Sequence, residues 1–197
     1  MRYNVERIRE IVKSDPRREI IYFWGHTPDS KKMTKACFSQ WYDCYFTIDG
    51  VCYHTTEQYM MASKALLFGD EDTYREIMAA YEPMKYKKLG RKVRNFDPKV
   101  WDERKYDIVV EGNKAKFGQN PELMEFLMST GDAIIVEASP YDTIWGIGID
   151  METAKAGTVR DWKGENLLGC ALMETRDWLR EKSNQQNKLN YERLYIR

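Results

Sequence analysis

The stretch TTEQYMMASKALLF, residues 55–68, predicts a helix with two charged side chains on its otherwise apolar face. Thr55 followed three residues later by Gln58 fits the capping-box pattern that begins helices. Glu57 and Lys64 are seven residues apart, about two helical turns, so they lie on one face with methionines between them. At about 10 Å the two side chains cannot form an ordinary intrahelical salt bridge. They either line a cleft or extend from a half-buried face with their charged ends in water.

The segments on either side of this helix predict an α+β fold that is mostly helical with a small β-sheet. Apolar runs at residues 19–24 and 133–138 predict short strands, and the alternation around Asp49-Gly50 predicts a β-hairpin. Helical spacing, capping residues and helix-starting prolines predict further helices over residues 4–13, 72–81, 83–90, 98–117, 121–130 and 167–182, the last one capped by Asn166.

No internal repeat and no linker divides the chain. We therefore expect an N-terminal helical extension over residues 1–20, a single domain over residues 21–182 and a C-terminal tail over residues 183–197. At 197 residues, of which 43% are hydrophobic, the chain is long enough to bury a core and does not belong to the disordered class.

Composition and charge argue against several classes of protein. The 31 basic and 31 acidic residues balance, which argues against a generic nucleic-acid binder. No apolar run has the length of a membrane span, and the charged N-terminus lacks the apolar segment of a secretory signal. The four cysteines have no CxxC spacing and there are only two histidines, so we expect free thiols, no metal and no cofactor. Together these features predict a cytoplasmic protein with no membrane partner.

Six cations stand within PMKYKKLGRKVRNF, residues 83–96, although the chain has no net charge. Such a cluster either binds a phosphate or pyrophosphate through charge-assisted hydrogen bonds, or is an ordinary solvated helix face. The six residues are Lys85, Lys87, Lys88, Arg91, Lys92 and Arg94.

The stretch VEASPYDTIWGIG, residues 136–148, leads from a strand into a loop that carries a carboxylate and a tryptophan. Trp145 follows Asp142 in this loop, and Trp101 stands near the start of a predicted helix. Tryptophans near carboxylates suit stacking against a flat base, although packing in the core is the alternative for each of them. The chain has none of the common glycine-rich nucleotide cradles, so any nucleotide must be held in another way.

Six stretches resemble, in the same order and spacing, the pattern of the NADAR superfamily over residues 22–181. They are FWGH, FSQWY, IDGVCYHTTEQYMMASKAL, LGRKVRNFDPKVWDERKYDIVVEGNKAKFGQNPEL, LMSTGDAIIVEASPYDTIWGIGI and GENLLGCALMETRDWLR. This superfamily comprises N-glycosidases, including an enzyme that acts on riboflavin-biosynthesis intermediates, and hydrolases that remove ADP-ribose from guanine. The resemblance implies an α+β domain that hydrolyses the bond between a ribose C1 and a nitrogen base.

The resemblance also implies where the active site lies. Glu57, Lys64 and Asp142 are the expected catalytic residues. We expect Glu137, on the strand before the loop, to be a structural partner. The residues expected to bind the substrate are Trp101, Trp145, Tyr59, Lys88 and Arg91.

Cleavage of a ribosyl–nitrogen bond builds positive charge on C1 and negative charge on the departing base. The catalyst needs a carboxylate near C1 and a proton donor near the base, and Asp142 and Glu57 divide these roles by analogy with sugar hydrolysis. Lys64 has two alternative roles. It either pairs with a phosphate or with Glu57, or it attacks C1 to give an imine with the opened ribose.

Two substrates fit this chemistry. One is a phosphorylated ribosylamino-pyrimidine of the riboflavin pathway, and the other is ADP-ribose attached to guanine, either free or in nucleic acid. In each case the basic cluster would hold the phosphate or pyrophosphate. The alternative from another class is a non-catalytic ADP-ribose or NAD-binding module, which would not need Glu57, Lys64 and Asp142 together.

Overall fold

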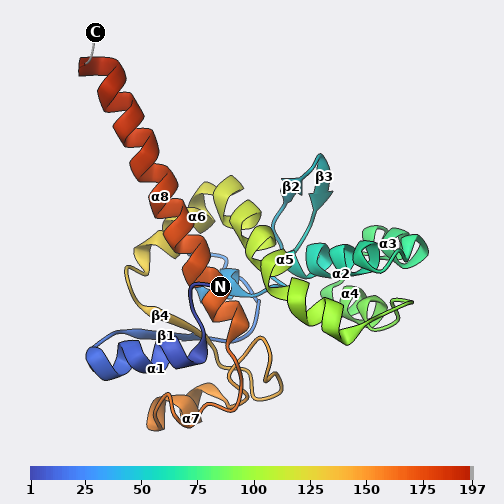
Figure 1. The fold of residues 1–197 in the computed structure, drawn as a ribbon, viewed down its shortest axis with the longest axis horizontal. Coiled ribbons are helices and arrows are strands. Elements are labelled where there is room, and N and C mark those ends of the chain that lie inside the picture. Colours follow the sequence, from blue (N-terminus) through green and yellow to red (C-terminus); the bar gives the residue numbers. More distant parts are fainter. Residues whose placement is uncertain (196–197) are drawn as a thin grey trace.

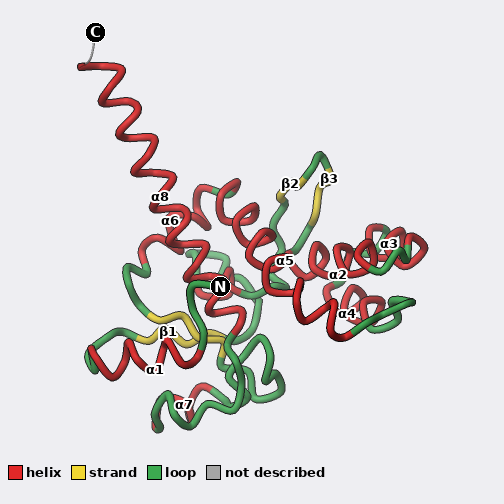
Figure 2. The backbone as a smooth tube through the Cα atoms, in the orientation of Figure 1, coloured by secondary structure: helices red, strands yellow, loops and turns green. Residues whose placement is uncertain are grey.

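The structure, a computed structural model, describes the backbone of residues 1–195 and the side chains of residues 1–188. It confirms an α+β fold that is mostly helical, with short strands and long loops (Figure 1, Figure 2). The strands are β1 (Ile20–Phe23), β2 (Phe46–Ile48), β3 (Val51–Tyr53) and β4 (Ile134–Glu137). The helices are α1 (Val5–Ser14), the 3-10 helix η1 (Lys35–Phe38), α2 (Thr56–Leu67), α3 (Glu71–Met78), α4 (Pro83–Gly90), α5 (Pro98–Gln119), α6 (Pro121–Ser129), α7 (Met151–Ala156) and α8 (Leu167–Tyr195).

The described strands form two separate pairs. β1 and β4 are parallel, with Ile20 opposite Ile134 and Phe23 opposite Glu137. β2 and β3 form the antiparallel hairpin that was predicted around Asp49-Gly50. Because parallel neighbours end at the same edge of a sheet, the chain leaves β1 and β4 side by side. That edge is where the loops of the candidate site begin.

Helix α2 lies among α3, α4 and α5, and most of its surface is covered. Its N-terminus forms the predicted cap: the Thr55 hydroxyl accepts a hydrogen bond from the N–H of Gln58 at 3.0 Å. The Gln58 side chain in turn accepts from the N–H of His54 at 2.8 Å, one residue before the usual capping-box partner. A helix buried this deeply can carry charged residues only where they face a cavity or find partners.

The N-terminal segment packs onto the domain. Ile8 of α1 has no exposed surface and belongs to the core. The Tyr3 hydroxyl donates a hydrogen bond to Asp177 of α8 at 2.8 Å. Helix α1 is therefore part of the folded body of the protein.

Helix α8 is longer than the sequence pattern predicted. We expected it to end near Lys182 and to be followed by a tail, but the structure continues the helix to Tyr195, and its far end projects from the domain (Figure 1). Residues 183–195 contain neither proline nor glycine, so nothing in the sequence ends the helix at residue 182. None of the helices in the described part of the chain combines the length and the apolarity needed to cross a membrane.

Asn166 has a different role from the predicted one. Instead of capping α8 with its side chain, it bonds to the edge of β4 that β1 leaves uncovered. Its Oδ1 accepts from the N–H of Glu137 at 3.0 Å, and its Nδ2 donates to the carbonyl of Ile135 at 3.0 Å. The residue is completely buried, with a φ of 53° in the left-handed region that asparagine tolerates well. The amide thus takes the place of a neighbouring strand.

We predict that Asn166→Ala lowers the free energy of unfolding by about 2–4 kcal/mol, because it leaves the Glu137 N–H and the Ile135 carbonyl buried without partners. Urea unfolding monitored by circular dichroism measures this loss. Asn95→Ala is the matched control, because Asn95 is exposed and has a similar φ of 55°. Equal losses in both variants would mean that the left-handed backbone, and not the amide bridge, is responsible.

Candidate active site

A pocket of about 750 Å³ lies between α2, α4 and the loops that follow β1 and β4. Residues 24–26 follow β1 and residues 139–145 follow β4, so the two parallel strands deliver both loops to the same cavity. Residues 39–41, just after η1, form a further part of the wall. Ligand pockets of enzymes commonly have this size and this position at the carboxyl ends of strands.

The face of α2 that the sequence singled out lines this pocket. Glu57, Met60, Met61 and Lys64 all contribute to the wall. This confirms the first of the two alternatives for the charged pair, namely that both side chains line a cleft. Helical phase placed Glu57 and Lys64 on one face but left both alternatives open, and the structure decides between them.

Glu57 is 5% exposed, and its backbone N–H donates to the carbonyl of Gln40 at 2.9 Å. Burial raises the pKa of its carboxyl group from 4.5 to about 7. The positive charge of Lys87 and a hydrogen bond with Trp41 act in the opposite direction, and the charge of Asp142 raises the pKa further. Glu57 is therefore suited to proton transfer near neutral pH.

Lys64 is half-buried against aromatic rings. Its Nζ donates to the carbonyl of Gly90 at 2.9 Å and lies 4.0 Å from the ring centre of Phe96 and 5.4 Å from that of Trp101. Burial lowers the pKa of the Lys64 ammonium group, which increases the fraction present as a neutral amine. A Cβ at position 90 would overlap the sulfur of Met61, so the Met61 side chain would have to move.

Asp142 shapes the loop after β4. Its Oδ1 accepts from the N–H groups of Ile144 at 2.9 Å and Trp145 at 2.8 Å. Gly146 is required here, because a Cβ would lie 3.0 Å from the Asp142 carbonyl oxygen and 2.9 Å from that of Glu137. The loop is thus fixed by its own hydrogen bonds, and Asp142 and Trp145 are held at the pocket wall.

Glu137 is the main residue whose place the sequence reasoning misjudged. We expected a structural partner, but Glu137 lines the pocket, and its Oε2 is buried without a hydrogen-bond partner among the described residues. Burial raises the pKa of this carboxyl group from 4.5 to about 8, with further contributions from Asp142 and Glu57. The pocket therefore contains three carboxyl groups. The described residues include no cluster of histidine, cysteine or carboxylate groups arranged to hold a metal ion.

A family model described as the NADAR domain matches residues 22–180, which is most of the chain. The chain belongs to the NADAR family. Its match to the model spans the pocket-lining loops, α2 and α4, so the cavity lies entirely within the NADAR domain.

The chain is similar to several known proteins of this family. N-glycosidase R617 of Acanthamoeba polyphaga mimivirus is 47% identical over 79% of this chain and 95% of its own length. N-glycosidase YbiA of Escherichia coli (strain K12) is 30% identical over 91% of this chain and 98% of its own. The NMR structure of E. coli YbiA has a TM-score of 0.69 and covers 84% of this chain and 88% of its own. The chloroplastic riboflavin biosynthesis protein PYRR of Zea mays is 32% identical over 67% of this chain, but only 20% of that protein is covered.

The basic cluster of the NADAR domain is divided between the pocket and the solvent. Lys87 of α4 and Arg91, the C-cap residue four positions later, line the pocket. Lys88, which we predicted to bind substrate, is exposed and lies outside the pocket lining. It follows Lys87 on the helix, so its side chain is rotated by about 100° away from that of Lys87. Arg94 is already paired with Asp70 at 2.6 Å and with Asp72 at 2.8 Å.

Two of the predicted aromatic residues lie outside the pocket lining. Trp145 lines the cavity, whereas Trp101 lies outside the lining, with its ring centre 5.4 Å from the Nζ of the pocket residue Lys64. Tyr59 is buried on another face of α2, where its hydroxyl donates to Glu111 at 2.6 Å and its ring packs against Phe46 and Tyr53.

The sequence reasoning missed pocket residues that stand in the family stretches FWGH and FSQWY. Their position in stretches that resemble the family pattern was a signal of function. Their spacing, however, does not distinguish residues that line the pocket from residues that pack in the core. The missed residues are Trp24, Gly25, His26, Ser39, Gln40 and Trp41.

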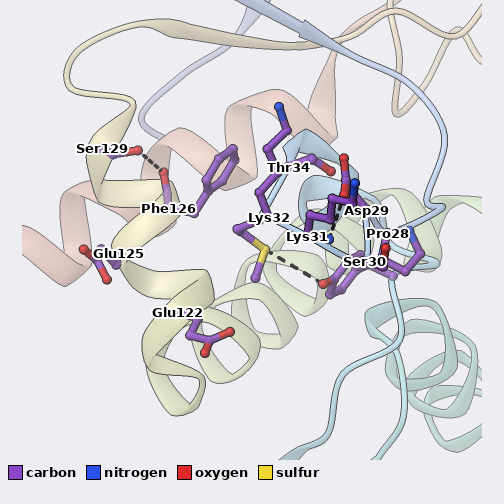
Figure 3. Close-up of a pocket in the computed structure, with 12 residues that line it drawn as sticks. Pro28, Asp29, Ser30, Lys31, Lys32, Thr34, Glu122, Glu125, Phe126 and Ser129 are labelled. Atoms are coloured by element: carbon purple, nitrogen blue, oxygen red, sulfur yellow. Dashed lines mark hydrogen bonds between the residues drawn. The ribbon is translucent and has the colours of Figure 1, made fainter.

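A second pocket, of about 630 Å³, lies between residues 28–34 and α6 (Figure 3). Lys31 and Lys32 lie on one wall, and Glu122 and Glu125 on the other. None of the predicted site residues lines this second pocket.

We predict that Glu57→Gln changes the pH dependence of stability. As pH rises, the unfolded chain loses the Glu57 proton near pH 4.5 but the folded chain only near pH 7, so the wild type loses stability between these two values. The free energy of unfolding of Glu57→Gln, relative to that of the wild type, should therefore rise by roughly 3 kcal/mol between pH 4 and pH 8. Urea titrations at both pH values measure this gain. The exposed residue Glu103 supplies the control variant Glu103→Gln, which should follow the wild type. A pH-independent difference for Glu57→Gln would contradict the buried, raised-pKa carboxyl group.

Proposed function

We propose that this protein is an N-glycosidase that hydrolyses the bond between a ribose C1 and a nitrogen base in a phosphorylated, nucleotide-like substrate. The observation that carries the proposal is one cavity that combines Glu57, Asp142 and Lys64 with the cations Lys87 and Arg91. Two relatives in the same family that are named N-glycosidase support the reaction class.

The polar groups of the pocket suit the charges of this reaction. The carboxylate of Asp142 stabilises the positive charge that develops on C1, and Glu57 takes part in proton transfer. Lys64, whose pKa burial lowers, attacks C1 as the base departs and forms an imine with the opened ribose. Water then releases the ribose. Trp145, held beside Asp142, forms a flat surface against the base.

The substrate phosphate is expected to bind to Lys87 and Arg91. Their spacing on α4 directs both side chains to the pocket, and an arginine binds a phosphate through two parallel hydrogen bonds. A ribosylamino-pyrimidine phosphate of the riboflavin pathway is the first candidate substrate, supported by the maize relative named a riboflavin biosynthesis protein.

ADP-ribosylated guanine is the second candidate, supported by the mouth of the pocket. Trp24 and Tyr141 line it with 58% and 88% of their surfaces exposed. Their ring centres are 6.4 Å apart. Exposed aromatic rings at a pocket entrance can stack against a second base, which ADP-ribosylated guanine has and a ribosylamino-pyrimidine lacks.

The first test compares both candidate substrates in parallel, with release of the free base measured by chromatography. We expect turnover of at least one substrate, and Asp142→Asn should lower kcat by about 100-fold or more because it removes the charge opposite C1. Asparagine keeps an oxygen that can accept from Ile144 and Trp145, so the loop should remain folded.

Borohydride added during turnover should leave a reduced ribosyl adduct on Lys64, detected by mass spectrometry of the peptide that contains it. Absence of the adduct would remove the imine step. Tight ADP-ribose binding with turnover of neither substrate would instead identify a binding module.

A second prediction separates the pocket cations from the rest of the cluster. Lys87→Met or Arg91→Met should raise KM for the phosphorylated substrate by about 10- to 100-fold, because each loses a charge-assisted hydrogen bond. The dephosphorylated analogue should show little change. Lys88→Met is the matched control on the same helix, since Lys88 is exposed and outside the pocket. An equal rise in KM for Lys88→Met would show that the helix acts only through its general positive charge.

A further inference from the structure

We propose that Glu137 is the acid that protonates the departing base, an assignment that rests on the proposed N-glycosidase function. Glu137 is the last residue of β4 and lines the same pocket as Glu57 and Asp142. Three carboxyl groups share the cavity, and the reaction requires them to act in different protonation states.

The backbone of Glu137 is fixed on both sides. Its N–H donates to Asn166 Oδ1 at 3.0 Å, and its carbonyl accepts from the N–H of Ile147 at 2.9 Å. It also stands opposite Phe23 in the parallel pairing of β1 with β4. A side chain on such a rigid support can be held at one place relative to a bound substrate.

The side chain of Glu137, in contrast, has an unused polar atom. Its Oε2 is buried and has no hydrogen-bond partner among the described residues. Buried polar atoms are almost always paired, so an unpaired one that belongs to a pocket wall calls for a ligand or a catalytic role. The same pocket has a second such atom in Gln40 Nε2, whose amide is oriented by the bond from Asn113 to Gln40 Oε1 at 3.3 Å.

The groups that face Glu137 favour its neutral form. Burial is the largest cause of its raised pKa of about 8, followed by the negative charges of Asp142 and Glu57, and only Lys87 acts against them. His26 and Tyr141 also line the cavity. A carboxyl group with this pKa keeps its proton at neutral pH and can give it up during a reaction.

The proposed step balances as follows. The C1–N bond breaks with its electron pair on the base nitrogen, which takes the proton of the Glu137 carboxylic acid, while the neutral Lys64 amine bonds to C1. The ring oxygen then leaves C1 and takes a proton from the Lys64 nitrogen, which gives the protonated imine. Water adds to C1, the lysine departs, and the extra proton that it carries returns to the Glu137 carboxylate. The sum is one water consumed, one ribose and one free base formed. Glu57 and Asp142 remain available for the charge on C1 and for the water.

The test uses Glu137→Gln, which keeps the size and neutrality of the acid but cannot protonate the base. We expect kcat on the N-riboside to fall by about 100- to 10,000-fold with little change in KM. On the p-nitrophenyl O-riboside phosphate, whose leaving group departs without a proton, the loss should stay below about 10-fold. The wild-type rate should fall as pH rises through about 8, and Glu137→Gln should lack this limb. Glu103→Gln, at an exposed site on α5, controls for a surface change.

Infrared difference spectra give a readout that does not depend on activity. The wild type should show a protonated carboxyl C=O band at pH 7 that titrates near pH 8 and is absent in Glu137→Gln. Equal losses on both ribosides, or an unchanged pH profile and no such band, would overturn the role of Glu137 while the N-glycosidase function stands. A wild-type enzyme that cleaves no N-riboside would overturn the function itself, and the assignment of Glu137 with it.

Discussion

The two hydrogen bonds between the Asn166 amide and β4 hold together the parts of the molecule on which the pocket depends. Among the described strands, β1 alone pairs with β4, so without this amide two backbone groups on the other edge of β4 would be buried and unpaired. Because Asn166 directly precedes α8, the same residue ties the longest described helix to the end of the strand. The position of Glu137, and of the loop that continues to Asp142, follows from that connection.

The pocket is built at a cost in stability. Glu57 and Glu137 both have raised pKa values, so each makes folding less favourable at neutral pH than a neutral side chain of the same shape would. The surrounding core, which includes the fully buried Ile134, Ile135 and Val136 of β4, offsets this cost. Groups held in such an unfavourable state are a common property of active sites, because a reaction near pH 7 requires acids with pKa values close to that pH.

The sequence predicted those features that depend on local spacing. The bounds of α4 agree with the predicted range, and the phase of α2 placed Glu57 and Lys64 on one wall. Spacing could not tell which face of α4 meets the pocket: the predicted Lys88 lies outside the pocket lining, whereas Lys87 and the predicted Arg91 belong to it. Tyr59, also expected to bind the substrate, is two positions from Glu57 and therefore points to another side of α2.

Glu137 and Asn166 could not be predicted, for a different reason. A short buried strand gives no periodic signal that distinguishes a residue facing a cavity from one facing the core. The role of Asn166 depends on contacts with residues 29 and 31 positions away, and its place before a helix is also typical of a cap. Long-range hydrogen bonds of this kind become visible only when the chain is folded.

The charges of the pocket also link the two proposals. Lys87 is the one cation that lowers the pKa of Glu137, and it is also the residue proposed to bind the substrate phosphate. A phosphate bound to Lys87 brings negative charge that offsets the effect of the ammonium group on the carboxyl groups nearby. Under the two proposals together, substrate binding would favour the protonated form of Glu137 before the C1–N bond breaks. The contact proposed to hold the phosphate would thus also help to keep Glu137 in its protonated, neutral form.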